Sequence, residues 1–338
     1  MRTLLLPCLA AALALTGCVK RYATEPALQF ADLDYSGPTG QAWPLKELQL
    51  PGAQARYHLG HAPTLRYVEL NPGGARTVLF LHGLGSYLKF WRAQLDAVAA
   101  TGDRVIAIDQ LGFGKSDKPA TFPYTTEAFA ENVAEVLDLL HLERAVLVGH
   151  SMGGQTALST AIRFPDRVLA LGLVSPAGFE TFSRREQQWF KNVYHRGLVK
   201  DADEEAIWTN VRDANFQRWT PALEWLIEER VRLAKNADFD AYAYAQVRTV
   251  EGLARNDFVR ESLGRVAAPT LIIYGNGDRL IPNPFLHGGF TRDVMAWGQG
   301  QIKGAQLTEL KGCGHTVQLD CPTEFNEALL GFLKSAPR

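Results

Sequence analysis

The chain has 338 residues, of which 46% are hydrophobic and 21% charged, and its formal net charge is −1. These proportions are typical of a globular protein, so they exclude an intrinsically disordered chain and a protein with many membrane spans. Lysine and arginine form no concentrated run, which gives no electrostatic reason to expect nucleic acid as a partner.

The first residues predict an export signal. Arg2 precedes an apolar stretch over residues 4–15. This stretch is shorter than the ~20 helical residues that a membrane span needs. The segment Leu15-Thr-Gly-Cys18 resembles the lipobox of bacterial lipoproteins. An ordinary cleaved signal that contains an incidental cysteine is the alternative.

The lipobox resemblance implies that residues 1–17 are a signal peptide and that Cys18 becomes a lipidated N-terminus in the bacterial cell envelope. Val19 stands where inner-membrane lipoproteins carry aspartate, which favours the periplasmic face of the outer membrane. Residues 18–50 contain several prolines and glycines, so we expect a tether or an irregular lead-in there.

Beyond residue 50, short apolar runs rich in β-branched residues alternate with helical patterns. The expected strands are Thr77–Leu81, Val105–Ile108, Ala145–Val148, Val168–Val174 and Leu271–Tyr274. The expected helices are Lys89–Ala99, Thr126–Leu140, Met152–Arg163 and a closing helix, Thr323–Leu333. Thr64–Leu70 alternates in polarity and predicts an antiparallel strand. This order predicts an α/β fold with a mostly parallel, doubly wound sheet.

Strand patterns stop over residues 179–263, where only helical segments occur, beginning near Thr181, Glu204, Pro221 and Phe239. The sequence therefore predicts a helical lid inserted into a core formed by residues 51–178 and 264–338. Four of the seven tryptophans lie in this insertion. Most of its aromatic side chains are expected to pack the lid, and a few to line an apolar substrate pocket.

The segment Gly149-His-Ser-Met-Gly153 lies directly between a strand pattern and a helical pattern. In this setting the glycines allow a sharp turn that exposes the Ser151 hydroxyl above the sheet. The following helix points its N-terminal amides at the place where negative charge develops on a substrate. Ser151 is therefore the candidate nucleophile.

A serine hydroxyl needs a base that takes its proton. Of the eight histidines, His315 lies in a glycine-rich loop between the last strand pattern and the last helix, a setting that suits a catalytic base. His150 adjoins Ser151 on the turn and is expected to point away from it. His82 ends a strand and is expected to brace loops.

Asp278 ends the penultimate strand pattern and is the candidate carboxylate that orients His315. The alternative is an aspartate that only forms a turn in its glycine-rich loop. Asp109 ends an earlier strand and is the competing acid. It precedes the serine in the chain, however, and is expected to brace its own loop.

The backbone amides of Leu84 and Met152 are the expected donors to a developing oxyanion. Leu84 lies in the segment Phe80–Gly85 that ends a parallel strand, and Met152 is next to the nucleophile. Gly83–Gly85 and Gly112–Gly114 lack the third glycine or the Gly-Lys-Ser/Thr ending of nucleotide-binding loops. No group of histidines, cysteines and carboxylates has the spacing of a metal site. We therefore expect neither a metal nor an organic cofactor.

From about Thr64 to the C-terminus, the chain resembles the α/β-hydrolase superfamily. The matching segments are Leu81–Leu84, Asp109–Pro119, Gly149–Gly154, Tyr274–Asp278 and Gly312–His315. The pattern is most similar to capped esterases, lipases and carbon–carbon bond hydrolases. Haloalkane dehalogenases and epoxide hydrolases carry aspartate at the position of Ser151, so the resemblance disfavours those activities. The stretch Phe285–Gly304 departs from the family by being longer and richer in glycine.

The resemblance and the candidate triad imply a serine hydrolase that cleaves small apolar carboxylic esters through an acyl-serine intermediate. A carbon–carbon bond hydrolase or an acyltransferase would use the same triad. A noncatalytic envelope binding protein is an alternative of a different class, although such a protein has no need for a complete triad.

Four cysteines are present. Cys8 would be lost with the signal, and Cys18 would carry lipid. Cys313 and Cys321 remain, and in an oxidising envelope compartment they either form a small disulfide or stay as two free thiols.

Overall fold

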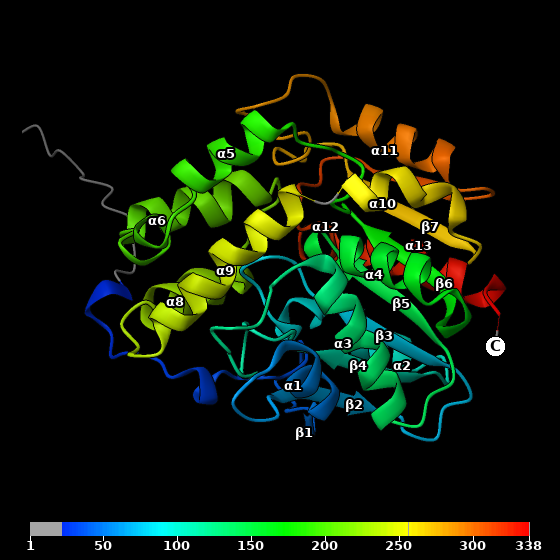
Figure 1. Cartoon of the computed structure of the whole chain (residues 1–338), viewed down its shortest axis with the longest axis horizontal. Coiled ribbons are helices and arrows are strands. Elements are labelled where there is room, and N and C mark those ends of the chain that lie inside the picture. The colour runs from blue at the N-terminus through cyan, green and yellow to red at the C-terminus, as the bar shows by residue number, and fades with distance from the viewer. Residues whose placement is uncertain (1–21, 256, 338) are drawn as a thin grey trace, which may run out of the picture.

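The computed structural model describes residues 22–255 and 257–337, so the expected signal peptide and Cys18 lie outside the described residues. An eight-stranded sheet has the order β1-β2-β4-β3-β5-β6-β7-β8 (Figure 1). Its strands are β1 Leu45–Gln49, β2 Thr64–Leu70, β3 Thr77–Leu81, β4 Arg104–Ile108, β5 Ala145–His150, β6 Val168–Val174, β7 Thr270–Gly275 and β8 Gln306–Leu310. β2 runs antiparallel to β1 and β4, and the other neighbouring strands are parallel.

This sheet confirms the predicted doubly wound α/β architecture. β2, β3 and β6 have the predicted bounds, and β4, β5 and β7 extend beyond them by one or two residues. Every residue of β3, β5 and β7 is buried, because helices cover both faces of the central strands. β1 was not predicted, because most of its side chains are exposed at the sheet edge and its sequence carries no apolar alternation.

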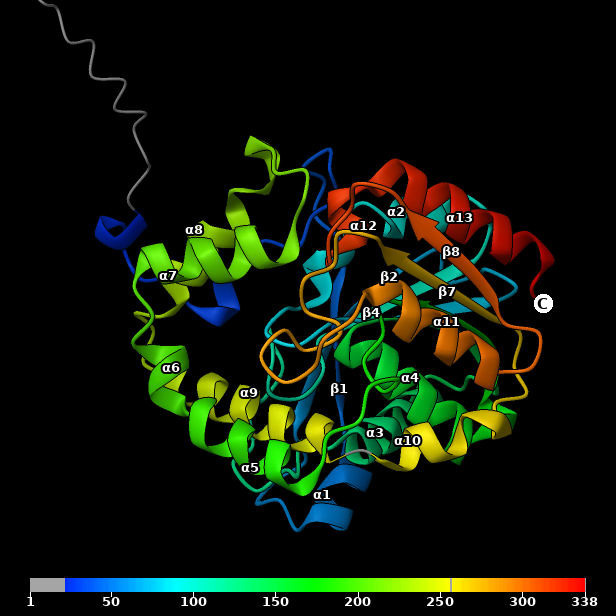
Figure 2. The ribbon, with the colours of Figure 1, turned by 90° about the horizontal axis from the view of Figure 1, so that it is seen from above.

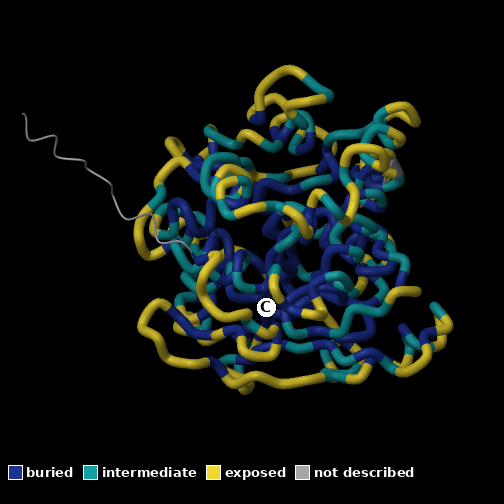
Figure 3. Tube along the Cα trace, turned by 90° about the vertical axis from the view of Figure 1, so that its left-hand side faces the viewer, coloured by how far each residue is buried: buried dark blue, intermediate teal, exposed yellow. Residues whose placement is uncertain are grey.

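Helices cover the two faces of the sheet (Figure 2). On one side lie α2 Leu95–Ala99 and α13 Pro322–Ser335. On the other lie α3 Thr126–Leu139, α4 Met152–Arg163 and α11 Thr291–Gln301. Buried residues gather in the interior of the trace, and exposed residues follow its outer loops (Figure 3).

The predicted helix Lys89–Ala99 is wrong as a single element. The chain forms a 3₁₀ turn, Leu88–Trp91, and then the short helix α2. The Leu88 amide donates to the buried Asp109 carboxylate over 2.8 Å, and the Trp91 side chain is fully buried. These two contacts fix the turn in the core, which periodicity alone does not reveal.

The segment between β6 and β7 is helical, as predicted (Figure 1). Its helices are α5 Arg184–Val193, α6 Arg196–Lys200, α7 Glu204–Trp208, α8 Trp225–Leu233, α9 Phe239–Ala254 and α10 Asp257–Ser262. Helix α5 begins after Ser183, whose side chain accepts from the Glu186 amide while Glu186 accepts from the Ser183 amide. This capping box sets the helix start a few residues after the expected one.

The lead-in before β1 is irregular, with two short 3₁₀ turns, but its described part does not behave as a free tether. The Tyr22 hydroxyl donates to Glu224 over 3.0 Å. The Lys235 ammonium donates to the carbonyl oxygens of Tyr22 and Ala23 over 3.1 and 2.6 Å. Prolines and glycines keep the segment out of regular structure, while these contacts hold it on α8.

Within the described part of the chain, no helix combines the length and apolar character that a membrane crossing requires.

Candidate functional site

Ser151 occupies the turn between β5 and α4, with φ 52° and ψ −112°. For a residue with a Cβ atom such a conformation costs about 1–3 kcal/mol, so surrounding contacts must hold it. The Ser151 amide donates to the Val174 carbonyl over 2.9 Å, and the Ser151 carbonyl accepts from the Ala177 amide over 3.1 Å. β6 and the loop after it thus fix the turn.

Two glycines are required by close backbone approaches at this turn. A Cβ atom at Gly149 would lie 2.2 Å from the Gly153 carbonyl oxygen. A Cβ atom at Gly153 would lie 2.2 Å from the Leu81 carbonyl oxygen at the end of β3. The start of α4 therefore packs directly on the strand end that leads into the predicted oxyanion loop.

His315 and Asp278 form a buried pair. The His315 Nδ1 atom and the Asp278 Oδ2 atom are 2.7 Å apart, and the two side chains are 5% and 0% exposed. The other carboxylate oxygen, Oδ1, accepts from the amides of Leu280 and Ile281 over 2.8 and 3.2 Å. With Nδ1–H donating to Asp278, His315 keeps Nε2 as the nitrogen that can accept a proton.

Ser151 and His315 line one cavity of about 690 Å³, together with residues of the helical insertion. Much of its wall is aromatic or aliphatic: Phe90, Phe182, Trp189, Phe216, Leu226 and Leu253. A second cavity of about 560 Å³ is lined by Asp278 but by neither Ser151 nor His315. The first cavity is therefore the one that joins two of the three triad candidates.

Leu84 also lines this cavity, and Met152 is the first residue of α4. The first four amides of an α-helix have no acceptor within the helix. The Met152 amide therefore has no acceptor within α4, and its role and that of the Leu84 amide stay predictions.

Asp109, the competing acid, takes part in a different set of contacts. Its carboxylate accepts from the amides of Leu88 and Lys115, each over 2.8 Å, and from the Tyr35 hydroxyl over 2.5 Å. Burial raises the pKa of Asp109 to about 6. These contacts join its own loop to the lead-in.

The structure places His150 against the loop that carries His315. Its Nε2 donates to the His315 carbonyl over 3.1 Å, and the two rings lie with centroids 4.9 Å apart. Burial and the neighbouring His315 hold the pKa of His150 well below its usual value. Sequence reasoning assigned His150 no contact, because its partner lies 165 residues further along the chain.

The stretch from Phe285 to Gly304 consists of an exposed loop and α11. The loop is tied to the helical insertion at Glu180, which accepts from the Asn283 amide over 2.7 Å and hydrogen-bonds His287. The hydrogen bond between Asp278 and His315 is intact with this stretch in place.

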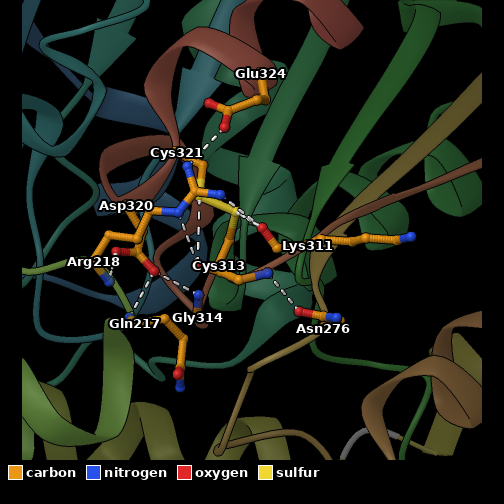
Figure 4. The surroundings of a disulfide bond; sticks show 10 residues. Gln217, Arg218, Asn276, Lys311, Cys313, Gly314, Asp320, Cys321 and Glu324 are labelled. Atoms are coloured by element: carbon orange, nitrogen blue, oxygen red, sulfur yellow. Dashed lines mark hydrogen bonds and ion pairs between the residues drawn. A yellow bond between two sulfur atoms is a disulfide. The ribbon is translucent and has the colours of Figure 1, made fainter.

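The loop that carries His315 is closed by a disulfide between Cys313 and Cys321 (Figure 4). This settles the alternative that the sequence left open. The buried Asp320 beside it accepts backbone hydrogen bonds from three residues (Figure 4). Sequence patterns did not single out Asp320, because two of its partners lie about a hundred residues away, in the insertion.

Among the described residues, no three histidine, cysteine or acidic side chains are grouped as a metal site would require.

Comparison with known proteins agrees with the fold described above. A family model described as the alpha/beta hydrolase fold matches residues 76–322. The chain is 30% identical over 283 residues to a putative carbamate hydrolase RutD of Variovorax paradoxus, covering 81% of this chain and 98% of that protein. It is 30% identical over 270 residues to a 2-hydroxymuconate semialdehyde hydrolase of Pseudomonas sp. strain CF600, covering 78% and 89%.

A crystal structure of a probable hydrolytic enzyme from Pseudomonas aeruginosa is similar over nearly the whole chain. The TM-score is 0.79 at 25% identity, and the match covers 91% of this chain and 98% of that one.

His82, which follows β3, is expected to make the stability of the folded protein depend on pH. The side chain is fully buried; its Nδ1 donates to the Gly83 carbonyl over 2.8 Å, and its Nε2 accepts from the Gln110 amide over 3.0 Å. Burial lowers the pKa of His82 from 6.5 to about 4. Between pH 6.5 and pH 4, His82 is protonated in the unfolded chain but stays neutral in the folded chain. The free energy of unfolding therefore falls as the pH falls through this range.

We predict that His82→Gln removes this loss, because glutamine can replace both hydrogen bonds and does not titrate. The free energy of unfolding of the wild type relative to the variant should drop by about 2 kcal/mol between pH 7.5 and pH 5. Urea unfolding at both pH values measures it. Asp109 and His150 are common to both proteins, so their titrations cancel in the difference. Parallel pH dependences would contradict the buried neutral state of His82.

Proposed function

The chain belongs to the α/β-hydrolase family, and on this premise we propose that it is a serine hydrolase that cleaves carboxylic esters through an acyl-serine intermediate. In this proposal Ser151 is the nucleophile, His315 the general base and Asp278 the carboxylate that orients the base. The observation that carries the proposal is the hydrogen bond between the buried side chains of His315 and Asp278, because His315 and Ser151 line the same cavity.

The proposed reaction has two balanced halves. The Ser151 oxygen attacks the ester carbonyl while His315 Nε2 takes the hydroxyl proton, and His315 then gives this proton to the departing alcohol. Water attacks the acyl-serine in the second half, again through His315, and the acid leaves. Asp278 keeps its charge throughout and stabilises the imidazolium that forms twice.

Negative charge develops on the carbonyl oxygen in both halves. We propose that the Leu84 and Met152 amides hold it, because fixed backbone donors need no reorganisation at the moment of reaction. The N-terminus of α4 adds its positive end to the same place.

The proposed substrates are apolar esters with short to medium acyl chains. The cavity wall is largely aromatic and aliphatic, and each methylene that leaves water contributes up to about 0.8 kcal/mol of binding until the cavity is filled. No step requires a metal or an organic cofactor.

A carbon–carbon bond hydrolase is the second candidate, and one feature of the cavity favours it. Arg230 lines the cavity and donates through Nη2 to the Val199 carbonyl over 2.6 Å. Its Nη1 atom is buried and has no hydrogen-bond partner among the described residues. A substrate carboxylate would pair with this cation, and one relative is a hydrolase of the carboxylate 2-hydroxymuconate semialdehyde.

We also propose that Cys18 carries lipid and holds the protein at the periplasmic face of the bacterial outer membrane. The support is the sequence Leu15-Thr-Gly-Cys18. Tyr22 is held on α8, and the four residues from Cys18 to Tyr22 reach at most about 14 Å when extended. A lipid at Cys18 would therefore keep the helical insertion close to the bilayer.

We predict that Ser151→Ala retains its fold and loses at least about three orders of magnitude of kcat/KM, since nucleophile and base act as a unit. Asp278→Asn should also be severe, because it favours the wrong histidine tautomer. Asp109→Asn is the matched control, being a buried acid of the same type outside the cavity. The assay uses p-nitrophenyl esters from acetate to long acyl chains, and circular dichroism checks each variant's fold.

A severe loss in Asp109→Asn with a mild one in Asp278→Asn would show that the acid is misassigned. The same assay compares 2-hydroxymuconate semialdehyde with the esters. A higher kcat/KM for this compound than for every ester would replace ester hydrolysis with carbon–carbon bond cleavage. An equal kcat/KM for all acyl lengths would contradict binding of the acyl chain in an apolar cavity of limited volume.

We predict that expression in a bacterium with lipoprotein processing gives a membrane-associated protein that begins at Cys18. Intact mass should show loss of residues 1–17 and a gain of acyl chains, and Cys18→Ser should abolish both the gain and the membrane association. Cys8→Ser is the control, because that residue leaves with the signal. An unmodified soluble protein, unchanged by Cys18→Ser, would rule out lipid anchoring.

A further inference from the structure

Asp320 is a buried acidic residue at the end of α12 Val317–Asp320, 5% exposed. Its Oδ2 atom accepts from the amides of Gly314 and Gln217 over 2.6 and 2.8 Å, and its Oδ1 atom accepts from the Arg218 amide over 2.7 Å (Figure 4). None of the described lysine, arginine or histidine side chains forms an ion pair with it. Among the described residues, the hydrogen bonds to this buried carboxyl group therefore all come from backbone amides.

These three donors come from two different parts of the protein. Gly314 directly precedes His315, whereas Gln217 and Arg218 belong to the helical insertion. The residue after His315 is tied to the insertion as well, because the Thr316 amide donates to the Asn215 carbonyl over 3.1 Å. A Cβ atom at Gly314 would lie 2.3 Å from that same carbonyl oxygen. Residues 215–218 thus hold the backbone on both sides of His315.

A second link between the same two segments is weaker. The Arg218 guanidinium donates to the Lys311 and Gly312 carbonyls over 2.8 and 3.1 Å, and it pairs with Glu324 over 2.7 Å. The Arg218 and Glu324 side chains are 46% and 43% exposed, so water competes for these contacts. Charge-assisted hydrogen bonds to the buried Asp320 carboxylate are stronger, and an amide left there without an acceptor is costly.

The disulfide between Cys313 and Cys321 joins the residues next to Gly314 and next to Asp320. It therefore keeps the Asp320 carboxylate and the Gly314 amide on one closed loop. His150 adds a third hold, through its hydrogen bond to the His315 carbonyl. Asp278 orients the imidazole, and these contacts locate the backbone that carries it.

We propose that Asp320 is a positioning residue that couples the helical insertion to His315. Asn215 and Phe216 line the cavity, so the coupling makes this part of the substrate wall and the base move as one body. The proposal rests on the proposed function only in taking His315 as the base. Movement of the insertion on substrate binding is then expected away from residues 215–218, at the part where Val193 and Leu198 line the cavity and are exposed.

The test is Asp320→Asn, which keeps the shape of the side chain and removes one of its two acceptor oxygens. Glu324→Gln is the matched control, because it breaks the exposed ion pair to Arg218 and leaves Asp320 in place. Hydrogen exchange read by mass spectrometry should rise at least tenfold in Asp320→Asn over residues 214–218 and 311–321 together, and in neither segment of the control. A rise in one segment alone, or in neither, would overturn the coupling whatever the activity of the protein.

The second readout separates positioning from general destabilisation. Active sites are titrated with a fluorophosphonate, and kcat is expressed per titrated site on a p-nitrophenyl ester. Asp320→Asn should lower this kcat at least tenfold with KM within about threefold, because the base is displaced while most of the cavity stays. An unchanged kcat per site with fewer titratable sites would mean that Asp320 only stabilises the fold. A wild type that is not titrated would refute the proposed function and leave the hydrogen-exchange result standing.

Discussion

The hydrogen bond between His315 and Asp278 is the contact on which the geometry of the candidate site depends. A carboxylate that is withdrawn from water is costly unless donors replace its hydration. The Asp278 side chain is fully buried, and it accepts from two backbone amides on one oxygen and from the His315 Nδ1 on the other. The His315 hydrogen bond compensates the desolvation of the Asp278 carboxylate. The same bond also fixes the histidine tautomer that a general base requires.

The rest of the structure keeps the two partners of this bond and Ser151 at one edge of the sheet. Asp278 follows β7, His315 follows β8, and Ser151 follows β5, so all three lie beyond the carboxyl ends of parallel strands. The helical insertion between β6 and β7 covers this edge and supplies most of the apolar wall of the cavity. It is also fastened to the histidine loop through Asp320 and to the acid loop through Glu180. Substrate contact and catalytic geometry are thereby linked.

The parts of this arrangement that depend on local patterns could be predicted from the sequence. β3 and β6 were predicted to the residue because buried parallel strands are continuous apolar runs with polar boundaries. The turn at Ser151 could be placed because strand, glycines and helix follow one another in the chain. The edge strand β1 and the 3₁₀ turn before α2 were missed, since an exposed strand has no apolar signature and the turn is fixed by the distant Asp109.

Long-range contacts between a side chain and a backbone were beyond sequence reasoning. Asp320 sits in an ordinary helical pattern, and only the folded chain brings it to the amides of Gln217 and Arg218. The pairing of Cys313 with Cys321 needed the 6.0 Å separation of their Cα atoms, which spacing in the sequence does not give. The Nη1 atom of Arg230, which has no hydrogen-bond partner among the described residues, could likewise not be singled out from the other charged residues of the insertion.

Covalent labelling shows whether Ser151 is a nucleophile activated by His315. The wild-type protein is incubated with a fluorophosphonate, its mass is measured intact, and the modified peptide is sequenced by mass spectrometry. We expect one adduct per chain, on Ser151, and much slower formation of this adduct in His315→Ala. An adduct on another residue, or no adduct on a folded wild-type protein, would contradict it.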